Sequence, residues 1–497
     1  MAIGSKALLS KFSQKLNIKN MNLPARSSLF FTATNLLCKG AAFLFTPLFT
    51  RLLTPADYGE YSLFGALLSL SAVAVTMEIP GGIIMRLYQK EKDRRFLSIS
   101  AAWLISVIAA VPTVLILWLI RRSLGFGMNF PLAYFFLFIS LISISIINLY
   151  VARCKFLYKW IPPLITSLVQ SVAAPIISIA LLRLNYLSDL NHVSVKIGAV
   201  TLVLGLSALV ISAITVKSAR SEIKNQSESP KDALLYVKGS VKFLLKLALP
   251  LLPYYISIIL ISQADKLFIS EFIGKGELAK YSVAYSAGVA LTALTGGVMG
   301  ALSPWLMRKA RAGEYDKIRA VLNRIISASI PAIVIFLCFA PEFFAFLAPK
   351  EYQTALPVLF ISAIIPIPLA LAQCSSSIAI AKEKVGGVLF SGIVPAFLTV
   401  ALDFLVIKSV PLYAPAIITA TGFLLLSALG IANIRKITGK FTINVNKAFQ
   451  NLLFLTTVAT AIFVFKNTIA VRISIAILSA LCLALMAKPL ITLLREK

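Results

Sequence analysis

Long apolar segments separated by short polar loops recur along the whole chain. A helix needs about 20 apolar residues to cross the roughly 30 Å of hydrocarbon in a bilayer, and fourteen segments meet this requirement. The predicted spans are residues 28–50, 58–86, 97–120, 130–152, 161–182, 196–216, 243–265, 278–305, 325–347, 354–379, 386–407, 411–433, 448–466 and 471–493. The pattern therefore predicts an all-α polytopic membrane protein with about 14 transmembrane helices.

A polar, charged segment interrupts this pattern between the sixth and seventh predicted spans. Its position predicts a linker between two lobes of similar size. A weak internal repeat supports two lobes, because TRLLTPADYGEYSL (residues 50–63) is similar to DKLFISEFIGKGELAKYSV (residues 265–283) once a five-residue insertion is allowed. The alternative is chance similarity between two apolar segments. We expect a cytoplasmic or interfacial N-terminal segment, an N-terminal six-helix lobe, a cytoplasmic linker, a C-terminal six-helix lobe and two additional helices, at residues 1–27, 28–216, 217–242, 243–433 and 434–497.

Composition and charge agree with a membrane location and orient the chain. Hydrophobic residues make up 59% and charged residues 13% of the 497 residues, and the mean hydropathy is +0.90. The net charge of +29 comes from Lys and Arg in short loops rather than on one hydrated face, which argues against a nucleic-acid partner. Most of these residues fall in the N-terminal segment, the loops after even-numbered spans and the C-terminus. The positive-inside rule therefore predicts cytoplasmic termini and a cell inner (plasma) membrane location.

The sequence lacks the motifs of nucleotide-driven pumps and of common hydrolytic enzymes. It contains no GxxxxGK[ST] loop, no HExxH, no GxSxG and no DxD motif in a soluble segment. Five cysteines without CxxC spacing and a single histidine, His192, give no metal site. We therefore expect a transporter rather than an enzyme, without metal or cofactor. Its energy would come from the substrate or from a coupling ion, H+ or Na+, which the sequence does not identify.

Two ionisable residues lie deep inside predicted spans, where charge is costly unless a cavity, partner or ligand compensates it. Lys39 is mid-way along span 1, too deep for its side chain to reach either interface comfortably. Glu78 lies in span 2 at a similar depth, within TMEIPGG. Two interpretations remain open. The residues form a structural ion pair, or Glu78 is a protonatable switch that releases Lys39 for an anionic ligand.

Helix-breaking residues accompany polar or aromatic groups in both predicted lobes. Next to Glu78, the residues that weaken the helix and mark a candidate hinge are Pro80, Gly81 and Gly82. In span 7 the equivalent breakers are Pro250 and Pro253, beside Tyr254 and Tyr255. The two tyrosines are candidates for stacking on sugar rings in a substrate cavity, although aromatic residues in membrane helices commonly serve packing.

Charged residues at predicted outer span ends are candidates for gating or for the outer mouth. Arg51 and Asp57 lie at the corner between spans 1 and 2, and Asp265 and Lys266 occupy the related place after span 7. The alternative is that they anchor the helices at the membrane interface, which is also our expectation for Asp403 near the end of span 11.

The segment NLLCKGAAFLFTPLFTRLLTPADYGEYSL, Asn35–Leu63, resembles the opening of bacterial polysaccharide flippases of the O-antigen type, with the run Arg51–Ser62 as its core. These flippases form the polysaccharide transporter family of the multidrug/oligosaccharidyl-lipid/polysaccharide exporter superfamily. The resemblance implies two pseudo-symmetric six-helix bundles plus two C-terminal helices, and a central cavity lined by spans 1, 2, 7 and 8. It also implies that a basic cavity residue, matched here by Lys39, attracts the substrate.

The implied substrate is a polyprenyl-pyrophosphate-linked oligosaccharide of lipopolysaccharide synthesis, moved from the cytoplasmic to the periplasmic leaflet by alternating access. Implied partners are membrane lipids and, beyond them, a polysaccharide polymerase and a chain-length regulator. Two transport alternatives remain: a flippase for the peptidoglycan precursor, and a cation-coupled multidrug antiporter, which would prefer an acidic cavity. A membrane-embedded sugar polymerase is disfavoured, because every predicted outer loop is short.

Overall fold

The computed structural model describes residues 23–81, 83–90, 94–121, 128, 132–184, 192–225, 230–382, 384, 386–440 and 443–495. Every regular element in these ranges is a helix. The first half contains α2 (Leu23–Leu52), α3 (Pro55–Thr76), the 3₁₀ helix η2 (Ile79–Gly81), α4 (Ile83–Lys90), α5 (Arg95–Ile120), α6 (Ala133–Phe156), α7 (Ile161–Leu168), the π-helical η3 (Val169–Ala173), α8 (Ala174–Arg183) and α9 (His192–Asn225).

The second half follows after α10 (Pro230–Ala248), which begins in the segment predicted as a linker and extends beyond its limit at residue 242. Its helices are α11 (Leu252–Phe272), α12 (Lys275–Val289), α13 (Thr292–Arg311), α14 (Tyr315–Cys338), α15 (Ala340–Leu347), the 3₁₀ helix η5 (Lys350–Ala355), α16 (Leu356–Ser362), α17 (Pro366–Ala381), α18 (Gly386–Val406), α19 (Ala414–Thr438), α20 (Val445–Val464) and α21 (Ile469–Arg495).

The all-helical membrane fold is confirmed. Within the described residues, eleven helices are long and apolar enough to cross a membrane, and shorter apolar helices occupy Phe43–Leu52 and Ile469–Leu485. Each of the fourteen predicted spans except the seventh coincides with one helix or with consecutive helices. Large apolar side chains stay exposed on the outward faces of several helices, as expected for surfaces that contact lipid. Examples are Leu119, Leu209, Phe397 and Leu485.

The predicted limits of span 7, residues 243–265, are wrong at both ends. Helix α10 continues to Ala248, the chain turns at residues 249–251, and α11 then runs to Phe272. Pro250 lies in this turn and Pro253 in the first turn of α11. Proline lacks a backbone N–H and disfavours a helical residue before it, so the two prolines separate the helices. Because the residues on both sides of this turn are apolar, the hydropathy pattern does not show where one helix ends and the next begins.

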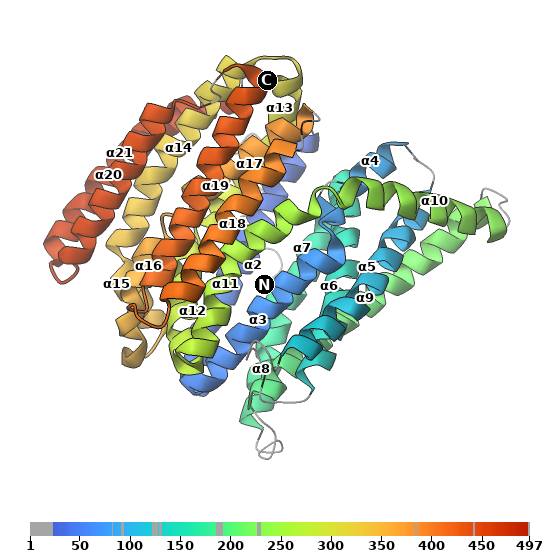
Figure 1. Ribbon diagram of the computed structural model, residues 1–497, viewed down its shortest axis with the longest axis horizontal. Helices are drawn as coiled ribbons and strands as arrows, with labels where there is room; N and C mark the ends of the chain where they lie inside the picture. The colour runs from blue at the N-terminus through green and yellow to red at the C-terminus, as the bar shows by residue number, and fades with distance from the viewer. Residues whose placement is uncertain are drawn as a thin grey trace, which may run out of the picture.

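The helices form two groups that meet along α2, α3, α11 and α12 (Figure 1). The N-terminal group is α2–α9 and the C-terminal group is α11–α19. Helix α3 packs against α11 and α12, and α2 packs against α13. Helix α10 packs on α4 and α5, across one end of the N-terminal group (Figure 1). The domain limits predicted from the sequence stay predictions.

Helices α20 and α21 lie on the outside of the C-terminal group, where both pack against α14 (Figure 1). Arg472 of α21 is only 4% exposed. Its guanidinium donates to the Glu342 carboxylate of α15 at 2.7 Å and to the Cys338 carbonyl at 2.7 Å. A charge-assisted contact of this kind fixes the outer pair of helices to the bundle in one register.

Candidate functional site

The second span is broken where α3 ends at Thr76. Met77 and Glu78 both have left-handed backbone conformations, with φ of 48° and 51°, and the 3₁₀ helix η2 follows. Each non-glycine residue held in this region costs about 1–3 kcal/mol, and such strain concentrates at functional sites. The predicted hinge residues Pro80 and Gly81 belong to η2, whereas Gly82 lies outside the described residues.

Glu78 projects from this strained turn to the place where the two groups of helices face each other. It is partly buried, and its electrostatic neighbours are Lys155 at the end of α6 and Tyr255 of α11. A Cβ atom on Gly81 would lie 2.6 Å from Glu78 Oε1, so the carboxylate conformation requires glycine there. Lys39 belongs to α2, but its side chain lies outside the described part, so its pairing with Glu78 stays a prediction.

The two tyrosines at the start of α11 have different surroundings. Tyr254 is 3% exposed and packs so closely on α18 that a Cβ on Gly392 would lie 2.7 Å from Tyr254 Cδ2. The rings of Tyr254 and Tyr255 meet edge to face at 5.6 Å. The structure therefore places Tyr254 in the packed interior of the C-terminal group and brings only Tyr255 near Glu78.

One end of the interface between the groups is closed by polar contacts, which we call the seam. Thr50 Oγ1 donates to the Leu347 carbonyl at 2.8 Å, and the Arg51 guanidinium donates to the Phe346 carbonyl at 3.3 Å. Buried Glu60 of α3 pairs with Lys275 of α12 at 3.3 Å. The seam therefore joins the corner between α2 and α3 to the end of α15. Through the Glu60–Lys275 pair, it also joins α3 to the start of α12, and these two helices contain parts of the proposed internal repeat.

Two further features of the seam explain the TPADYGEY sequence at its centre. A Cβ on Gly59 would lie 1.8 Å from the Lys275 carbonyl oxygen, so only glycine permits this approach of α3 to α12. Thr54 caps α3 by accepting from the Asp57 N–H at 3.2 Å, and its hydroxyl contacts Asp57 Oδ2 at 2.7 Å. Asp57 thus helps to start α3, and a gating role for it remains a prediction.

Asp265 and Lys266 lie inside the C-terminal group rather than at an outer mouth. Because α11 continues to Phe272, both residues are two turns from its end, and they are 0% and 9% exposed. Asp265 accepts hydrogen bonds from the Tyr281 hydroxyl, from Thr419 Oγ1 at 3.2 Å and from the Lys266 N–H at 2.7 Å. The predicted end of span 7 at residue 265 is therefore two turns too early, and a gating role for the two residues stays a prediction.

A second carboxylate, Asp403 of α18, completes a buried acidic pair. It is 0% exposed and an electrostatic neighbour of Asp265. Neither of its oxygens has a hydrogen-bond partner among the described residues. The Lys266 ammonium, meanwhile, points to Gln263 Oε1 at 2.7 Å and lies 4.7 Å from the centre of the Tyr285 ring. Two neighbouring buried carboxylates can retain a proton or hold a small cation. Asp403 lies in the last turn of α18, near the helix end as expected, but its side chain is buried among the helices.

A buried lysine in the N-terminal group was missed by the sequence reasoning. Lys196 of α9 is 2% exposed, and its Nζ lies 3.8, 4.7 and 3.5 Å from the ring centres of Phe49, Tyr58 and Tyr61. Such a site holds a cation through the negative faces of aromatic rings. The hydrophobic positions that start at Val193 were the available sequence signal that the helix begins before Lys196. In the structure α9 begins at His192, so Lys196 lies inside the helix.

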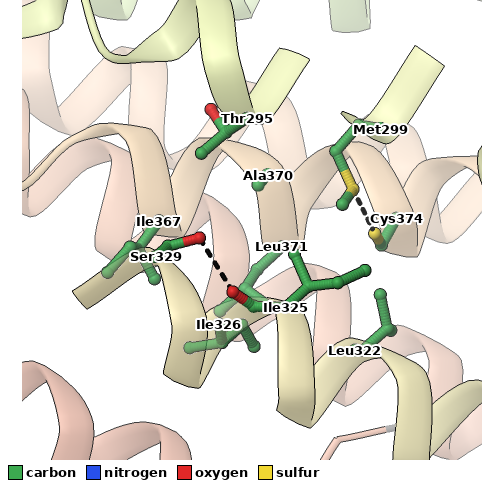
Figure 2. A pocket seen from close by; sticks show the side chains of 10 residues that line it. All are labelled: Thr295, Met299, Leu322, Ile325, Ile326, Ser329, Ile367, Ala370, Leu371 and Cys374. Carbon is green, nitrogen blue, oxygen red and sulfur yellow. Dashed lines mark hydrogen bonds between the residues drawn. The ribbon is translucent and has the colours of Figure 1, made fainter. Parts of the chain in front are cut away.

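The apolar cavity in Figure 2 is unsuited to a substrate. It lies between α13, α14 and α17 and has a volume of about 10 Å³. Its lining includes Met299 and Cys374, whose sulfur atoms are 3.1 Å apart (Figure 2). This volume has room for about one water molecule. Among the described residues no group of three or more His, Cys, Asp or Glu side chains is placed to hold a metal ion.

Comparisons with known proteins agree with these observations. The model of the family described as polysaccharide biosynthesis protein matches residues 25–309. A comparison with curated protein sequences finds no match. The chain is similar to a solved structure of the lipid II flippase MurJ in an inward closed conformation, with a TM-score of 0.63, 15% identity, and coverage of 93% of this chain and 100% of that one.

Transporters of the multidrug MATE family have a similar fold. An outward-facing member of the MOP superfamily matches with a TM-score of 0.57 and 14% identity over 85% of this chain and 97% of its own. The Vibrio cholerae transporter VcmN matches with a TM-score of 0.54 and 16% identity over 86% and 98%. These likenesses show a shared fold over 85–93% of this chain, which extends beyond the part that the family model covers.

Proposed function

The chain belongs to the polysaccharide biosynthesis protein family, and from this premise we propose that it is a flippase for a polyprenyl-pyrophosphate-linked oligosaccharide. The substrate would move from the cytoplasmic to the periplasmic leaflet of the plasma membrane. The family match is the observation that carries the substrate class, because it covers the segment that contains Lys39, Glu78 and the Glu60–Lys275 pair of the seam.

The contacts between the two groups of helices support alternating access. The seam lies at corners that the positive-inside rule assigns to the periplasmic side, so the closed end faces the periplasm in this conformation. Substrate would then enter from the cytoplasmic leaflet, and its pyrophosphate would meet Lys39. Rocking of the two groups would break the Glu60–Lys275 pair and open the outer side.

The strained turn at Glu78 and the aromatic Tyr255 lie between the groups, where a change in their relative position acts directly. We propose that Glu78 exchanges partners between Lys155 and Tyr255 as the groups move. This would give the turn a role in gating, and it assigns sugar contact to Tyr255 rather than to Tyr254.

The buried acidic pair Asp265 and Asp403 is the proposed site of energy coupling. An H+ or Na+ ion bound there would neutralise one carboxylate and change the packing of α11 against α18. Because the sequence contains no nucleotide-binding loop, an ion gradient is the energy source that these side chains can use. The buried location fits a small ion rather than a cationic drug.

Deletion of the gene in its host tests the substrate class. We expect loss of surface polysaccharide together with accumulation of unpolymerised lipid-linked repeat units in the cytoplasmic leaflet. Complementation with the wild-type gene restores the polymer, and complementation with Lys39→Ala does not, although the variant protein inserts. Arrest of cell-wall synthesis would instead indicate a peptidoglycan-precursor flippase, and a normal surface with raised drug sensitivity would indicate an antiporter.

A further inference from the structure

Helix α10 has an inner face fixed to the N-terminal group. Its small and apolar side chains on this face are buried against α4 and α5; they are Ala233, Ser240, Leu244 and Ala248. The Tyr236 hydroxyl lies 2.9 Å from Ser98 Oγ of α5, and the Arg94 guanidinium lies 4.9 Å from the centre of the Tyr236 ring. The orientation of α10 about its own axis is therefore determined.

The outer face of α10 combines positive charge with exposed apolar groups. Leu234 and Leu235 are 69% and 73% exposed. Beside them, at helical spacing, are four exposed lysines: Lys231, Lys238, Lys242 and Lys246. Asp232 is the acidic residue of this helix. If this face contacted only water, two large apolar side chains would be exposed to solvent in the middle of a basic surface, which is unfavourable.

Neighbouring helices extend the positive surface. The end of α9 carries three exposed basic residues, namely Lys217, Arg220 and Lys224. Arg86 of α4, on which α10 packs, is exposed as well. Helix α10 crosses the end of the N-terminal group rather than continuing its bundle direction (Figure 1). A helix that lies across the end of a transmembrane bundle is placed at the depth of the lipid headgroups.

We propose that the outer face of α10 binds anionic phospholipid headgroups at the predicted cytoplasmic surface of the membrane. The lysine ammonium groups pair with headgroup phosphates, and Leu234 and Leu235 enter the boundary between headgroups and acyl chains. Basic residues beside large apolar residues on one helix face are typical of helices that lie in this boundary. The inference does not depend on the identity of the transported substrate.

The consequence of this binding is mechanical. Helix α10 is joined to α11 by only residues 249–251, so anionic lipid would hold the N-terminal group to the bilayer surface directly beside the connection to the C-terminal group. The C-terminal group would then move relative to an N-terminal group that is held at the bilayer surface. Transport would depend on the anionic lipid content of the leaflet.

A tryptophan at Leu235 tests the proposed contact in the full chain. Leu235→Trp is reconstituted in phosphatidylcholine vesicles with and without phosphatidylglycerol, and its emission is quenched with brominated phosphatidylcholine, after subtraction of the wild-type signal. Ala312→Trp, at an exposed position between α13 and α14 on the same predicted side, is the control. We expect quenching and a blue shift for Leu235→Trp that increase with phosphatidylglycerol, and neither for Ala312→Trp.

A second experiment removes the positive charge of α10. In the Leu235→Trp background, substitution of the four α10 lysines by Gln should abolish the dependence of quenching on phosphatidylglycerol. The control substitutes Lys382, Lys384, Lys436 and Lys447, which lie on the same predicted side of the C-terminal group, and should leave the dependence unchanged. Equal quenching of Leu235→Trp and Ala312→Trp would overturn the proposal, as would equal lipid dependence in the two quadruple variants. Equal quenching of the two tryptophans would indicate that the outer face of α10 contacts the cytosol or an acidic protein instead of lipid.

Discussion

At the scale of single residues, the most informative group is Asp403. A carboxylate removed from water and left without hydrogen bonds is costly to keep charged, and Asp403 is such a group within the described chain. Asp265 beside it accepts three hydrogen bonds. Under the proposed ion coupling, the two aspartates have different tasks: Asp265 holds the helices together, and Asp403 binds the ion.

Replacement of each aspartate by asparagine should separate these tasks. We expect Asp403→Asn to keep or raise the melting temperature and to abolish ion-driven transport, because it removes an uncompensated buried carboxylate. Asp265→Asn should lower the free energy of unfolding by about 1.5–3 kcal/mol, through weakened hydrogen bonds to a charged group. Thermal unfolding and vesicle transport measure both effects. Asp316→Asn, at a side chain that is 80% exposed, is the control, and loss of stability in Asp403→Asn would contradict this division.

Lys196 is a second residue whose role is open to a direct measurement. We expect Lys196→Met to keep the melting temperature, because Met retains the contacts with Phe49 and Tyr61 and removes a buried charge. Lys196→Ala should lower the free energy of unfolding by about 2–5 kcal/mol by leaving a cavity. If Met is as destabilising as Ala, the charge itself holds α9 to α3.

At the scale of elements, the strained turn between α3 and α4 concentrates the unusual backbone geometry of the chain. The sequence indicated a break here, because Pro80 and Gly81 disfavour a continuous helix. It did not indicate that Met77 and Glu78 would adopt left-handed conformations. Such conformations depend on the surrounding packing, which a local pattern does not contain.

A single methyl group added to this turn should lower transport activity more than it lowers insertion of the protein into the membrane. In Gly81→Ala the new Cβ would lie 2.6 Å from Glu78 Oε1, so the carboxylate must move away from Lys155 and Tyr255. We expect transport to fall strongly while the protein remains in the membrane. Gly65→Ala in α3, where a Cβ meets nothing within 4 Å, should transport normally. Normal transport by Gly81→Ala would remove Glu78 from the gating account.

The helical fold could be predicted from the sequence because each crossing of hydrocarbon demands a long apolar segment. Limits were predicted less well where two apolar helices follow each other, as at Pro250. Of the candidate site residues, Glu78 and Tyr255 are electrostatic neighbours and Tyr254, Asp265 and Asp403 are buried, so the roles proposed for them stay predictions. Depth and burial depend on helix packing, and Lys196 was overlooked because its partners come from distant positions in the chain.

At the scale of the whole molecule, the seam closes one end of the interface between the two groups of helices. Among the described residues, the Glu60–Lys275 pair joins α3 to α12, the Thr50 hydroxyl joins the end of α2 to α15, and Gly59 allows α3 and α12 to meet closely. We expect Glu60→Gln and Lys275→Gln, singly and together, to weaken this closure, with a coupling energy of about 0.5–3 kcal/mol between them.

Hydrogen–deuterium exchange of residues 50–60 and 270–280 measures that closure. Exchange should increase in both single variants and show little further increase in the double variant. Glu277→Gln is the matched control, because it breaks the Lys280–Glu277 pair within α12 and leaves the seam intact. Unchanged exchange in Glu60→Gln would show that the ion pair does not hold the groups together.

The central claim is the transfer of a lipid-linked glycan between leaflets, and a transfer assay in vesicles tests it most directly. Purified protein is reconstituted with a labelled polyprenyl-pyrophosphate oligosaccharide, and a membrane-impermeant glycosidase measures the glycan exposed on the outside. Under an H+ or Na+ gradient, we expect the protected inner-leaflet pool to become accessible with wild-type protein but not with Asp403→Asn or in protein-free vesicles. A pool that stays protected with folded wild-type protein under both gradients would contradict the account.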